Sequence, residues 1–310
     1  MNITIVIPNY NGEGLLEKNL PKLLMVLQNY KDGKTEIIIV DDGSIDKSIE
    51  LISKLKLKIS NLKLITNEKN LGFSSTVNKG VKEARGEIVI LLNTDVFPEE
   101  NFLEPLLAHF KDERVFAVGC MDKSIEKDKI VLRGRGLGKW EKGFLVHKRG
   151  EVDKTDTLWV SGGSGAFRKS IWEKLGGLNE LYNPFYWEDI DLSYRALKSG
   201  YKILFEPKSV VIHEHGKGAI KEKYSEKEVK KIAYRNQFIF SFENATDYKI
   251  QFEVFFWLPF HLLKALFRKD IAFFRGFFNA LVLLPKVIKS SLKAQRQFLL
   301  SDREVINRFK

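Results

Sequence analysis

Short runs of β-branched residues alternate with helix-length segments through the first hundred residues, and this alternation constrains the fold more than any other feature of the sequence. The runs cover residues 3–7, 36–40, 62–65 and 87–92, each flanked by turn residues. Apolar residues recur at helical spacing in the segments between them, residues 15–30, 46–56 and 73–84. Strands that alternate with helices favour a parallel sheet covered by crossover helices. The sequence therefore predicts an α/β fold with a doubly wound, mostly parallel sheet.

Polar and acidic side chains follow three of these runs, at the edge where a parallel sheet binds ligands. They are Pro8 and Tyr10 after the first run, Asp41 and Asp42 after the second, and Asn93, Thr94 and Asp95 after the fourth. The glycine-rich dinucleotide and P-loop patterns are both missing. We expect these loops to form one cleft, followed by shorter strands and Gly-rich loops over residues 116–167.

The carboxylates of this edge predict a site for a divalent cation. Asp41 and Asp42 are equally consistent with capping of a helix that starts near Asp46. Asp95 is a third carboxylate at the same edge, and clustered carboxylates commonly bind Mg²⁺ or Mn²⁺, hard cations that bridge a carboxylate to a diphosphate. An Asx turn before Pro98 is the alternative explanation of Asn93 and Asp95.

The segment FYWEDIDLSYR predicts a helix that begins near Trp187 and carries a general base. Glu188 and Asp189 lie at its N-terminus, where the helix dipole favours an ionised carboxylate, while Asp191 is spaced to pair with Arg195. An ionised Asp189 near an acceptor hydroxyl can take its proton. A solvated acidic helix start is the alternative.

His213 and His215 follow the apolar residues 210–212, which predict a further strand ending at the cleft. One imidazole can complete a metal site, and both point to the same side if the strand continues. A turn after Ile212 leaves only one within reach. A structural, hydrogen-bonded histidine is the alternative.

The last third of the chain differs in composition. Lys and Arg outnumber Asp and Glu by 19 to 9 over residues 217–310, against 32 to 31 over residues 1–216, and 14 of the 23 Phe residues lie in this last part. Its apolar segments 252–267 and 271–284 are each too short to span a bilayer. With the adjacent Lys and Arg they predict interfacial helices on an anionic membrane, the alternatives being a helical cap and a homodimer contact. No nucleic-acid signature is present, so we expect no nucleic-acid partner.

A single cysteine, Cys120, allows no intrachain disulfide and no C-x-x-C site. Met1 is followed at once by strand-like residues without the pattern of a signal peptide. These features predict a cytoplasmic protein, peripheral on the inner face of the membrane if the basic helices bind lipid.

Seven motifs in order resemble glycosyltransferase family 2, the inverting transferases with the GT-A fold, and in particular its rhamnosyltransferase-like members. They are IVIPNYNG, VDDGSIDKS, NLGFSSTVNKG, LLNTD, GGSGAFRKS, FYWEDIDLSYR and HEHG, spread over residues 1–216. The resemblance implies a GT-A type, Rossmann-like catalytic domain over residues 1–216 and a basic, Phe-rich helical extension over residues 217–310.

The resemblance also assigns roles to residues. A nucleotide diphosphate sugar (UDP, dTDP or GDP) is implied as the donor and a glycan or lipid-linked molecule as the acceptor, in synthesis of cell-surface polysaccharide or glycolipid. Asp189 matches the catalytic base, and Asp95 and His213 match the metal ligands. The donor residues are Pro8, Tyr10, Asp41, Asp42, Asn70, Gly72 and Asn93, and those beside the acceptor and donor sugar are Gly163, Ser164, Gly165, Trp187 and Glu188. The glycines are also explained by turns or close packing.

Two other activities fit parts of this pattern. A nucleotidyltransferase that makes the activated sugar needs basic residues in the first loop, and residues 8–14 contain no Lys or Arg. A nucleotide-sugar sensor retains the fold without turnover. The motif NTD also departs from the family, since many members have an acid where Asn93 stands, and we therefore expect a less negative metal site.

Overall fold

The computed structural model describes residues 1–126, 129–214 and 223–309, and within these ranges the chain forms a nine-stranded mixed sheet and a two-stranded hairpin. The sheet contains β1 (Ile3–Asn9), β2 (Thr35–Asp41), β3 (Leu62–Thr66), β4 (Ile88–Leu92), β5 (Val96–Pro98), β6 (Val115–Glu126), β7 (Lys129–Arg133), β10 (Ser164–Arg168) and β11 (Lys202–Glu214). The hairpin pairs β8 (Gly136–Glu141) with β9 (Phe144–Arg149).

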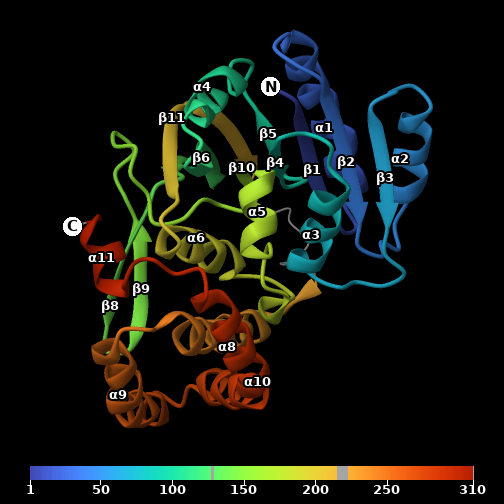
Figure 1. Cartoon of the computed structure of the whole chain (residues 1–310). Helices are drawn as coiled ribbons and strands as arrows, with labels where there is room; N and C mark the ends of the chain where they lie inside the picture. The colour runs from blue at the N-terminus through green and yellow to red at the C-terminus, as the bar shows by residue number, and fades with distance from the viewer. Residues whose placement is uncertain (127–128, 215–222, 310) are drawn as a thin grey trace.

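The sheet is mostly parallel, as predicted. Its order is β3-β2-β1-β4-β10-β6-β11-β5, with β7 paired to β6. Figure 1 shows β3, β2 and β1 side by side at one end of the sheet. The first four strands of the order are parallel, β10 runs antiparallel between β4 and β6, and β11 is parallel to β6. Shorter strands were expected over residues 116–167. Strands β7, β8, β9 and β10 have only 5 or 6 residues each, but β6 has 12 residues and gives β11 a long partner.

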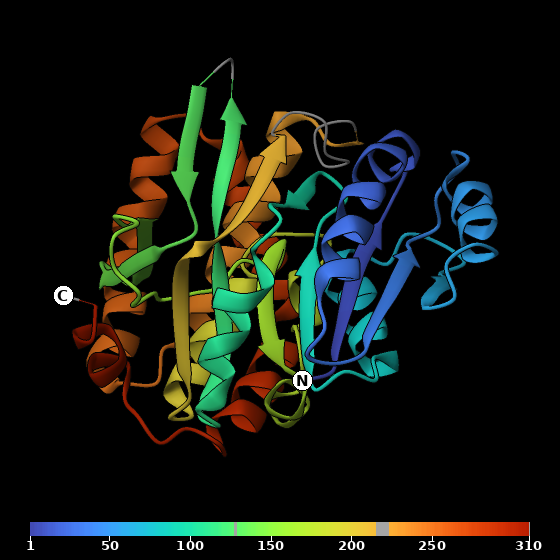
Figure 2. The same ribbon diagram turned by 90° about the horizontal axis from the view of Figure 1, so that it is seen from above.

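Alternate side chains of the strands enter two separate cores, one on each face of the sheet. Ile5 packs with helices α1 (Glu13–Asn29), α2 (Ser48–Lys56) and α4 (Leu103–Ala108), whereas its neighbour Val6 packs with α3 (Phe73–Glu83), α5 (Lys169–Leu175) and α6 (Glu188–Lys198). Figure 2 shows the helices on the two sides of the sheet. The sheet thus holds the loops at its edge between two packed helical layers.

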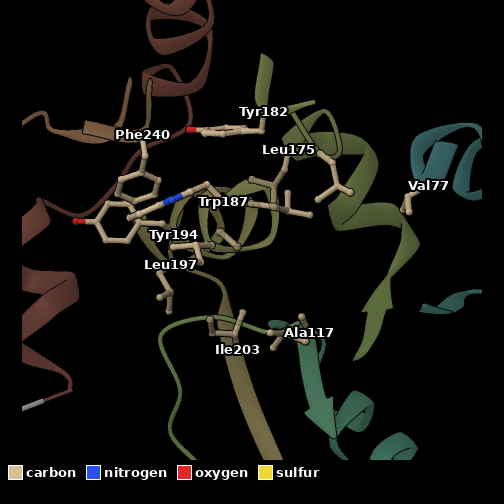
Figure 3. Close-up of a cluster of buried hydrophobic side chains, with 14 of the residues drawn as sticks. Val77, Ala117, Leu175, Tyr182, Trp187, Tyr194, Leu197, Ile203 and Phe240 are labelled. Atoms are coloured by element: carbon tan, nitrogen blue, oxygen red, sulfur yellow. The ribbon is translucent and has the colours of Figure 1, made fainter. Parts of the chain in front are cut away.

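The predicted helical extension consists of α8 (Glu226–Asn244), α9 (Tyr248–Phe267), α10 (Ile271–Gln295) and α11 (Asp302–Asn307). Phe240 of α8 packs against Trp187, the residue before α6, and against Tyr194 of α6, with ring centroids 5.1 and 5.5 Å apart (Figure 3). The extension therefore covers one face of the sheet domain and shares its core. The predicted boundary between residues 216 and 217 lies outside the described residues.

The predicted lengths of the apolar helices were too short. By length and composition α9, with 20 residues, and α10, with 25, are both sufficient to cross a membrane, although one or two such helices are weak evidence of spanning. Ala280 and Val287 of α10 are fully buried in the core, so this helix packs on protein along one face. The opposite face, and most of α9, is exposed.

A buried ion pair fastens the end of the chain to α6. Lys198 Nζ lies 2.7 Å from Asp302 Oδ1, and both side chains are fully buried. Asp302 also accepts hydrogen bonds from the Tyr194 hydroxyl at 2.8 Å and from the backbone N–H groups of Thr246 and Asp247 at 2.7 and 2.8 Å. The carboxylate therefore joins α6, the α8–α9 junction and α11.

We expect Asp302→Ala to lower the free energy of unfolding by about 3–5 kcal/mol, because it leaves the Lys198 ammonium buried without its counter-charge. Urea unfolding followed by circular dichroism measures the change. The exposed neighbour Arg303→Ala is the control and should shift it by less than about 0.5 kcal/mol. A loss below about 1 kcal/mol in Asp302→Ala would show that this pair does not hold the extension.

Candidate active site

Asp41 is held at the end of β2 by the loop that follows β1. Asn9 Nδ2 donates to Asp41 Oδ2 at 2.7 Å, and Ser44 donates from its backbone N–H at 2.9 Å and from its hydroxyl at 2.6 Å. Asp41 is fully buried. Asp41 does not cap α2. The backbone N–H of Ser48, the first residue of α2, donates instead to Asp46 Oδ1 at 3.0 Å. The Asp41 carboxylate thus joins the first and second loops of the predicted donor site.

Asp42 closes the loop that leads into α3. Its carboxylate accepts hydrogen bonds from Asn67 Nδ2 at 2.8 Å and from the backbone N–H groups of Leu71 and Gly72 at 2.8 and 2.9 Å. Gly72 has a φ of 92° and sits against the Asn183 side chain, where a Cβ would come within 2.8 Å of it. Both Asp42 oxygens are therefore engaged by the protein, and this residue shapes the segment that carries Asn70 and Gly72.

The turn after β4 contacts residues 161–163, the glycine-rich loop that precedes β10. The Asn93 backbone N–H donates to Gly163 O at 3.0 Å, and a Cβ on Gly163 would come within 2.5 Å of Asn93 Nδ2. Ser164 and Gly165 pair with Leu92 and Leu91 of β4 inside the sheet. Gly163 therefore permits the close approach that places Asn93 beside the predicted sugar loop.

Strand β11 continues through His213 and brings it to Asp95. His213 Nε2 lies 3.2 Å from Asp95 Oδ2, and His213 Nδ1 lies 3.0 Å from Asp122 Oδ2 on β6. Burial lowers the pKa of His213, but the hydrogen bonds that its ring donates to Asp122 and Asp95 outweigh this effect and raise the pKa to about 9. His215 lies outside the described residues.

The spacing of Asp95 and His213 fits a divalent cation. Adjacent ligands of an octahedral Mg²⁺ or Mn²⁺ lie roughly 3 Å apart when each bond is about 2.1 Å, and Asp95 Oδ2 and His213 Nε2 lie 3.2 Å apart. A cation bound there would replace the proton that His213 Nε2 donates to Asp95. The second contact of His213, to Asp122, is of the kind that orients metal-binding imidazoles. Among the described residues no group of three or more His, Cys, Asp or Glu side chains forms a cage for a metal. The protein would supply two ligands and leave the other positions to diphosphate oxygens and water.

Asp189 lies at the start of α6 and faces the glycine-rich loop. Its Oδ1 accepts from the Ile190 N–H at 2.8 Å, while Oδ2 has only a long contact of 3.4 Å to the Gly162 N–H. Burial raises the pKa of Asp189, and burial together with the nearby Asp189 charge raises the pKa of Glu188 well above its usual value. The weakly bonded Asp189 Oδ2 is the oxygen suited to accept a proton.

The chain enters α6 through two residues with left-handed backbone, Tyr186 at φ 72° and Trp187 at φ 78°. Such non-glycine residues carry strain that often accompanies a functional site. The Trp187 ring packs in the core against Phe240 and His147, so it positions α6 rather than lining the cleft. Asp191 points away from the cleft and pairs with Arg195 at 2.8 Å, as its spacing predicted.

The two halves of the site meet at Gly162. A Cβ there would lie 3.0 Å from the Phe73 ring, next to Gly72, and 3.7 Å from Asp189 Cβ. One chain of contacts thus leads from Asp42 through Gly72, Phe73 and Gly162 to Asp189. A second leads from Gly163 through Asn93 and its turn to Asp95 and His213.

Three residues of this edge were not predicted. Asn9 precedes Tyr10 in the first loop, and its 2 % exposure with a bond to Asp41 marks it as part of the site. Asp122 could not be found, because its register on β6 depends on a pairing with a distant strand. Lys223 places its ammonium 4.4 Å from the Tyr10 ring centroid, a contact that a local sequence pattern does not reveal.

Comparison with known proteins identifies the family to which the chain belongs. The sequence profile of the family described as Glycosyl transferase family 2 matches residues 4–176, more than half of the chain. The chain is 27% identical over 222 residues to the O-antigen chain rhamnosyltransferase RfbN of Salmonella typhimurium, covering 69% of this chain and 67% of RfbN. It is 28% identical over 217 residues to a poly-beta-1,6-N-acetyl-D-glucosamine synthase of Staphylococcus aureus, covering 66% of this chain and about half (48%) of the synthase.

Solved structures share the fold at lower identity. S. aureus TarS 1-349 in complex with UDP-GlcNAc superposes with a TM-score of 0.60 at 18% identity, covering 100% of this chain and 91% of TarS 1-349. GalNAc-T7 with UDP, GalNAc and Mn²⁺ gives a TM-score of 0.63 at 19% identity, covering 80% of this chain and 49% of GalNAc-T7. The fold is of the GT-A type. The chain belongs to glycosyl transferase family 2, as its motifs predicted.

We expect Asp42→Asn to disorganise the loop that carries Asn70 and Gly72 without touching Asp189, Asp95 or His213. The new NH2 group replaces one of the two oxygens and so faces the N–H donor of either Leu71 or Gly72. It should therefore lower the free energy of unfolding by about 1–3 kcal/mol and weaken nucleoside diphosphate binding by roughly tenfold, or about 1.4 kcal/mol. Calorimetric titration with UDP, dTDP and GDP measures the binding, with the exposed Asp32→Asn as control. Unchanged stability and affinity would contradict the assigned role.

Proposed function

We propose that this chain is a metal-assisted, inverting glycosyltransferase that moves a sugar from a nucleotide diphosphate sugar to an acceptor hydroxyl. The observation that carries the proposal is the position of Asp189, whose weakly bonded Oδ2 faces the loop that also contacts the Asn93–Asp95 turn. The acceptor oxygen forms a bond to the anomeric carbon, the bond to the diphosphate oxygen breaks, and the hydroxyl proton moves to Asp189 Oδ2. Attack from the opposite side inverts the anomeric carbon.

Asp95 and His213 would hold Mg²⁺ or Mn²⁺ beside the diphosphate. A bound cation neutralises the charge that grows on the leaving diphosphate. Asp122 holds the His213 ring in the orientation that presents Nε2 to Asp95. The Mn²⁺ in the GalNAc-T7 structure supports a divalent cation in this fold.

The donor nucleoside would lie over the loops after β1 and β2, with Pro8, Tyr10 and Asp41 beside it and Asn70 at its rim. The similarity to RfbN supports a rhamnose-like sugar and a role in cell-surface polysaccharide synthesis. The nucleotidyltransferase alternative is disfavoured by the first loop, which lacks the Lys or Arg needed to hold a triphosphate. The second alternative is a nucleotide-sugar sensor without turnover. Activity measurements on the native protein and on Asp189→Asn distinguish it from an enzyme.

We expect Asp189→Asn to lower kcat by about 10²–10⁴-fold, the usual contribution of a general base, with little change in donor affinity. In the native protein the raised pKa of Asp189 shifts the acid limb of the rate profile upward, because the base exists only above that pKa. The measurement is transfer or donor hydrolysis with UDP, dTDP and GDP sugars from pH 4 to 9. Full activity in the variant would refute the base, and no turnover of any donor by the native protein would favour the sensor.

A peripheral membrane contact is supported by the outer surface of the extension. Phe252, Phe256 and Phe267 of α9 are 64%, 60% and 85% exposed, and exposed apolar area of this kind is unusual on a free monomer. Lys142 lies 5.2 Å from the Trp257 ring centroid and 5.1 Å from that of Phe260, which adds positive charge to this surface. Apolar side chains beside cations suit an anionic lipid interface. We therefore propose that the protein lies at the inner face of the cytoplasmic membrane.

We expect the double variant Phe256→Ser, Phe267→Ser to float with anionic liposomes at less than one third of the native fraction. The control replaces two apolar residues that are equally exposed but lie on the other domain face, Met25→Ser and Leu57→Ser, and should float like the native chain. Analytical ultracentrifugation of the same proteins without liposomes tests the alternative, a homodimer contact through this surface. Equal flotation of both variants would refute lipid binding, and a native dimer that the Phe variant alone dissociates would replace it with a homodimer.

A further inference from the structure

Asn236 of α8 holds the loop that leads into α6, the helix of the candidate base. Its Nδ2 group donates to the backbone oxygens of Tyr182, Phe185 and Tyr186, each at 2.8 Å. Its Oδ1 accepts from Arg235 Nε at 2.8 Å, so both polar ends of the amide are engaged and its orientation is fixed. The side chain is fully buried. One amide of the C-terminal extension therefore fastens this loop at both of its ends.

Asn236 interrupts an apolar stripe of α8. Ile232 and Phe240, one turn before and one turn after it, share its face of the helix and are 6% and 0% exposed. Phe240 packs on the Trp187 ring at a centroid separation of 5.1 Å (Figure 3). A polar side chain costs free energy in such a stripe unless its hydrogen bonds are made. The amide is therefore explained by the carbonyl groups that it holds and not by packing.

These hydrogen bonds act on the strained part of the loop. Tyr186 and Trp187 both have left-handed backbone, with φ of 72° and 78°. The Tyr186 carbonyl belongs to the peptide unit between these two residues, and its oxygen accepts from Asn236. Strained residues of this kind persist only where the surrounding structure over-determines them. The Asn236 contact thus fixes the peptide plane from which α6 begins.

Helix α3 holds the same loop at its middle. Pro184 O accepts from the Phe73 N–H at 2.9 Å, and Asn183 Oδ1 accepts from the Ser74 N–H at 3.0 Å. Asn183 Nδ2 also donates to Ser75 Oγ at 2.7 Å. The family profile contains α3 but ends at residue 176. The loop is therefore held between a helix of the matched family region and a helix outside it.

The position of Asp189 depends on this loop. Glu188 and Asp189 are the first two residues of α6, and they follow Trp187 directly. Asp189 Oδ2 lies 3.4 Å from the Gly162 N–H, and burial at this place raises the pKa of the carboxyl group. A rotation of the peptide plane before Trp187 would turn the first residues of α6. The direction of Asp189 Oδ2 and its access to water would change together.

We propose that Asn236 is a positioning residue for glycosyl transfer, which holds the loop of residues 182–187 and thereby aims Asp189 Oδ2 at the acceptor hydroxyl. The proposal rests on the proposed function, because it takes Asp189 as the base. Asn236 acts on the reacting atoms through the backbone of the loop. Helix α8 is then part of the catalytic unit, although the sequence predicted residues 217–310 as a separate extension.

The test compares Asn236→Ala and Asn236→Ser with the native full chain. The Ala variant removes every hydrogen bond of the amide. The Ser variant keeps a hydroxyl donor and leaves a smaller cavity, so it reports on the loop even if the Ala variant does not fold. The control is Ser291→Ala on α10. Ser291 is 6% exposed and its hydroxyl donates to the backbone oxygen of Glu243 at 2.6 Å, so the control also loses a buried hydrogen bond of the extension.

We expect Asn236→Ala to lower kcat for donor hydrolysis by roughly 10²-fold, the effect of displacing a reacting group by about 1 Å. Asn236→Ser should fall between Asn236→Ala and the native chain, and Ser291→Ala should match the native chain. The KM for the donor sugar should stay close to the native value, because the hydrogen bonds of Asn236 go to the loop before α6 and not to the donor loops.

The pH profile separates positioning from a general loss of stability. In the Asn236 variants the acid limb of kcat should move to lower pH, because an Asp189 that is open to water has a pKa nearer its ordinary value. Glu188 is the titratable neighbour, and burial raises its pKa well above the usual value, so it is uncharged through this limb in the native chain. Native kcat in both Asn236 variants would overturn the proposal. A loss of kcat with an unmoved acid limb, or an equal loss in Ser291→Ala, would also overturn it.

Hydrogen exchange followed by mass spectrometry gives a readout that needs no turnover. Peptides covering residues 182–190 should exchange faster in the Asn236 variants than in the native chain, and those of α3 should not. Unchanged exchange over residues 182–190 would overturn the proposal. Absence of donor hydrolysis by the native chain would instead refute the proposed function, and faster exchange confined to the loop would still show that α8 holds it.

Discussion

The pairing of β11 with β5 and β6 is the constraint on which the site depends. It carries His213 to within 3.2 Å of Asp95, a residue 118 positions earlier in the chain, and it sets Asp122 on the other side of the imidazole ring. Without the long β6 strand, β11 would lack the partner that holds its end at the carboxyl edge of the parallel strands. The candidate metal ligands Asp95 and His213 are therefore positioned by sheet register and not by a local loop.

Buried carboxylates play two different parts around this edge. Asp42 and Asp302 are surrounded by N–H donors and hold loops and helices in place, whereas Asp189 keeps one oxygen with only a long contact. The distinction follows from hydrogen bonding, because a carboxylate whose acceptor capacity is filled by the protein has little left for a substrate. The same sequence pattern, an acid after a strand or at a helix start, thus yields both anchors and a candidate base.

The sequence predicts the first four strands and three helices well, because their hydrophobic periodicity is local. The family follows from ordered motifs, and the Asp191–Arg195 pair from helical spacing. Asp122 and the Lys223 contact with Tyr10 could not be predicted, since they arise where distant segments meet. The lengths of α9 and α10 were underestimated because the polar and charged residues that flank the apolar runs, such as Lys249 and Lys286, are exposed positions that continue the helix and do not end it.

The proposed glycosyl transfer depends on one cation between Asp95 and His213, at the sheet edge that also carries Asp189. The most direct measurement is an anomalous difference map from crystals of the native chain grown with Mn²⁺ and a nucleoside diphosphate. The account predicts one strong peak, roughly 2.2 Å from both an Asp95 carboxylate oxygen and His213 Nε2, with diphosphate oxygens completing its coordination. A peak elsewhere, or an ordered nucleoside diphosphate with no peak between these two side chains, would contradict it.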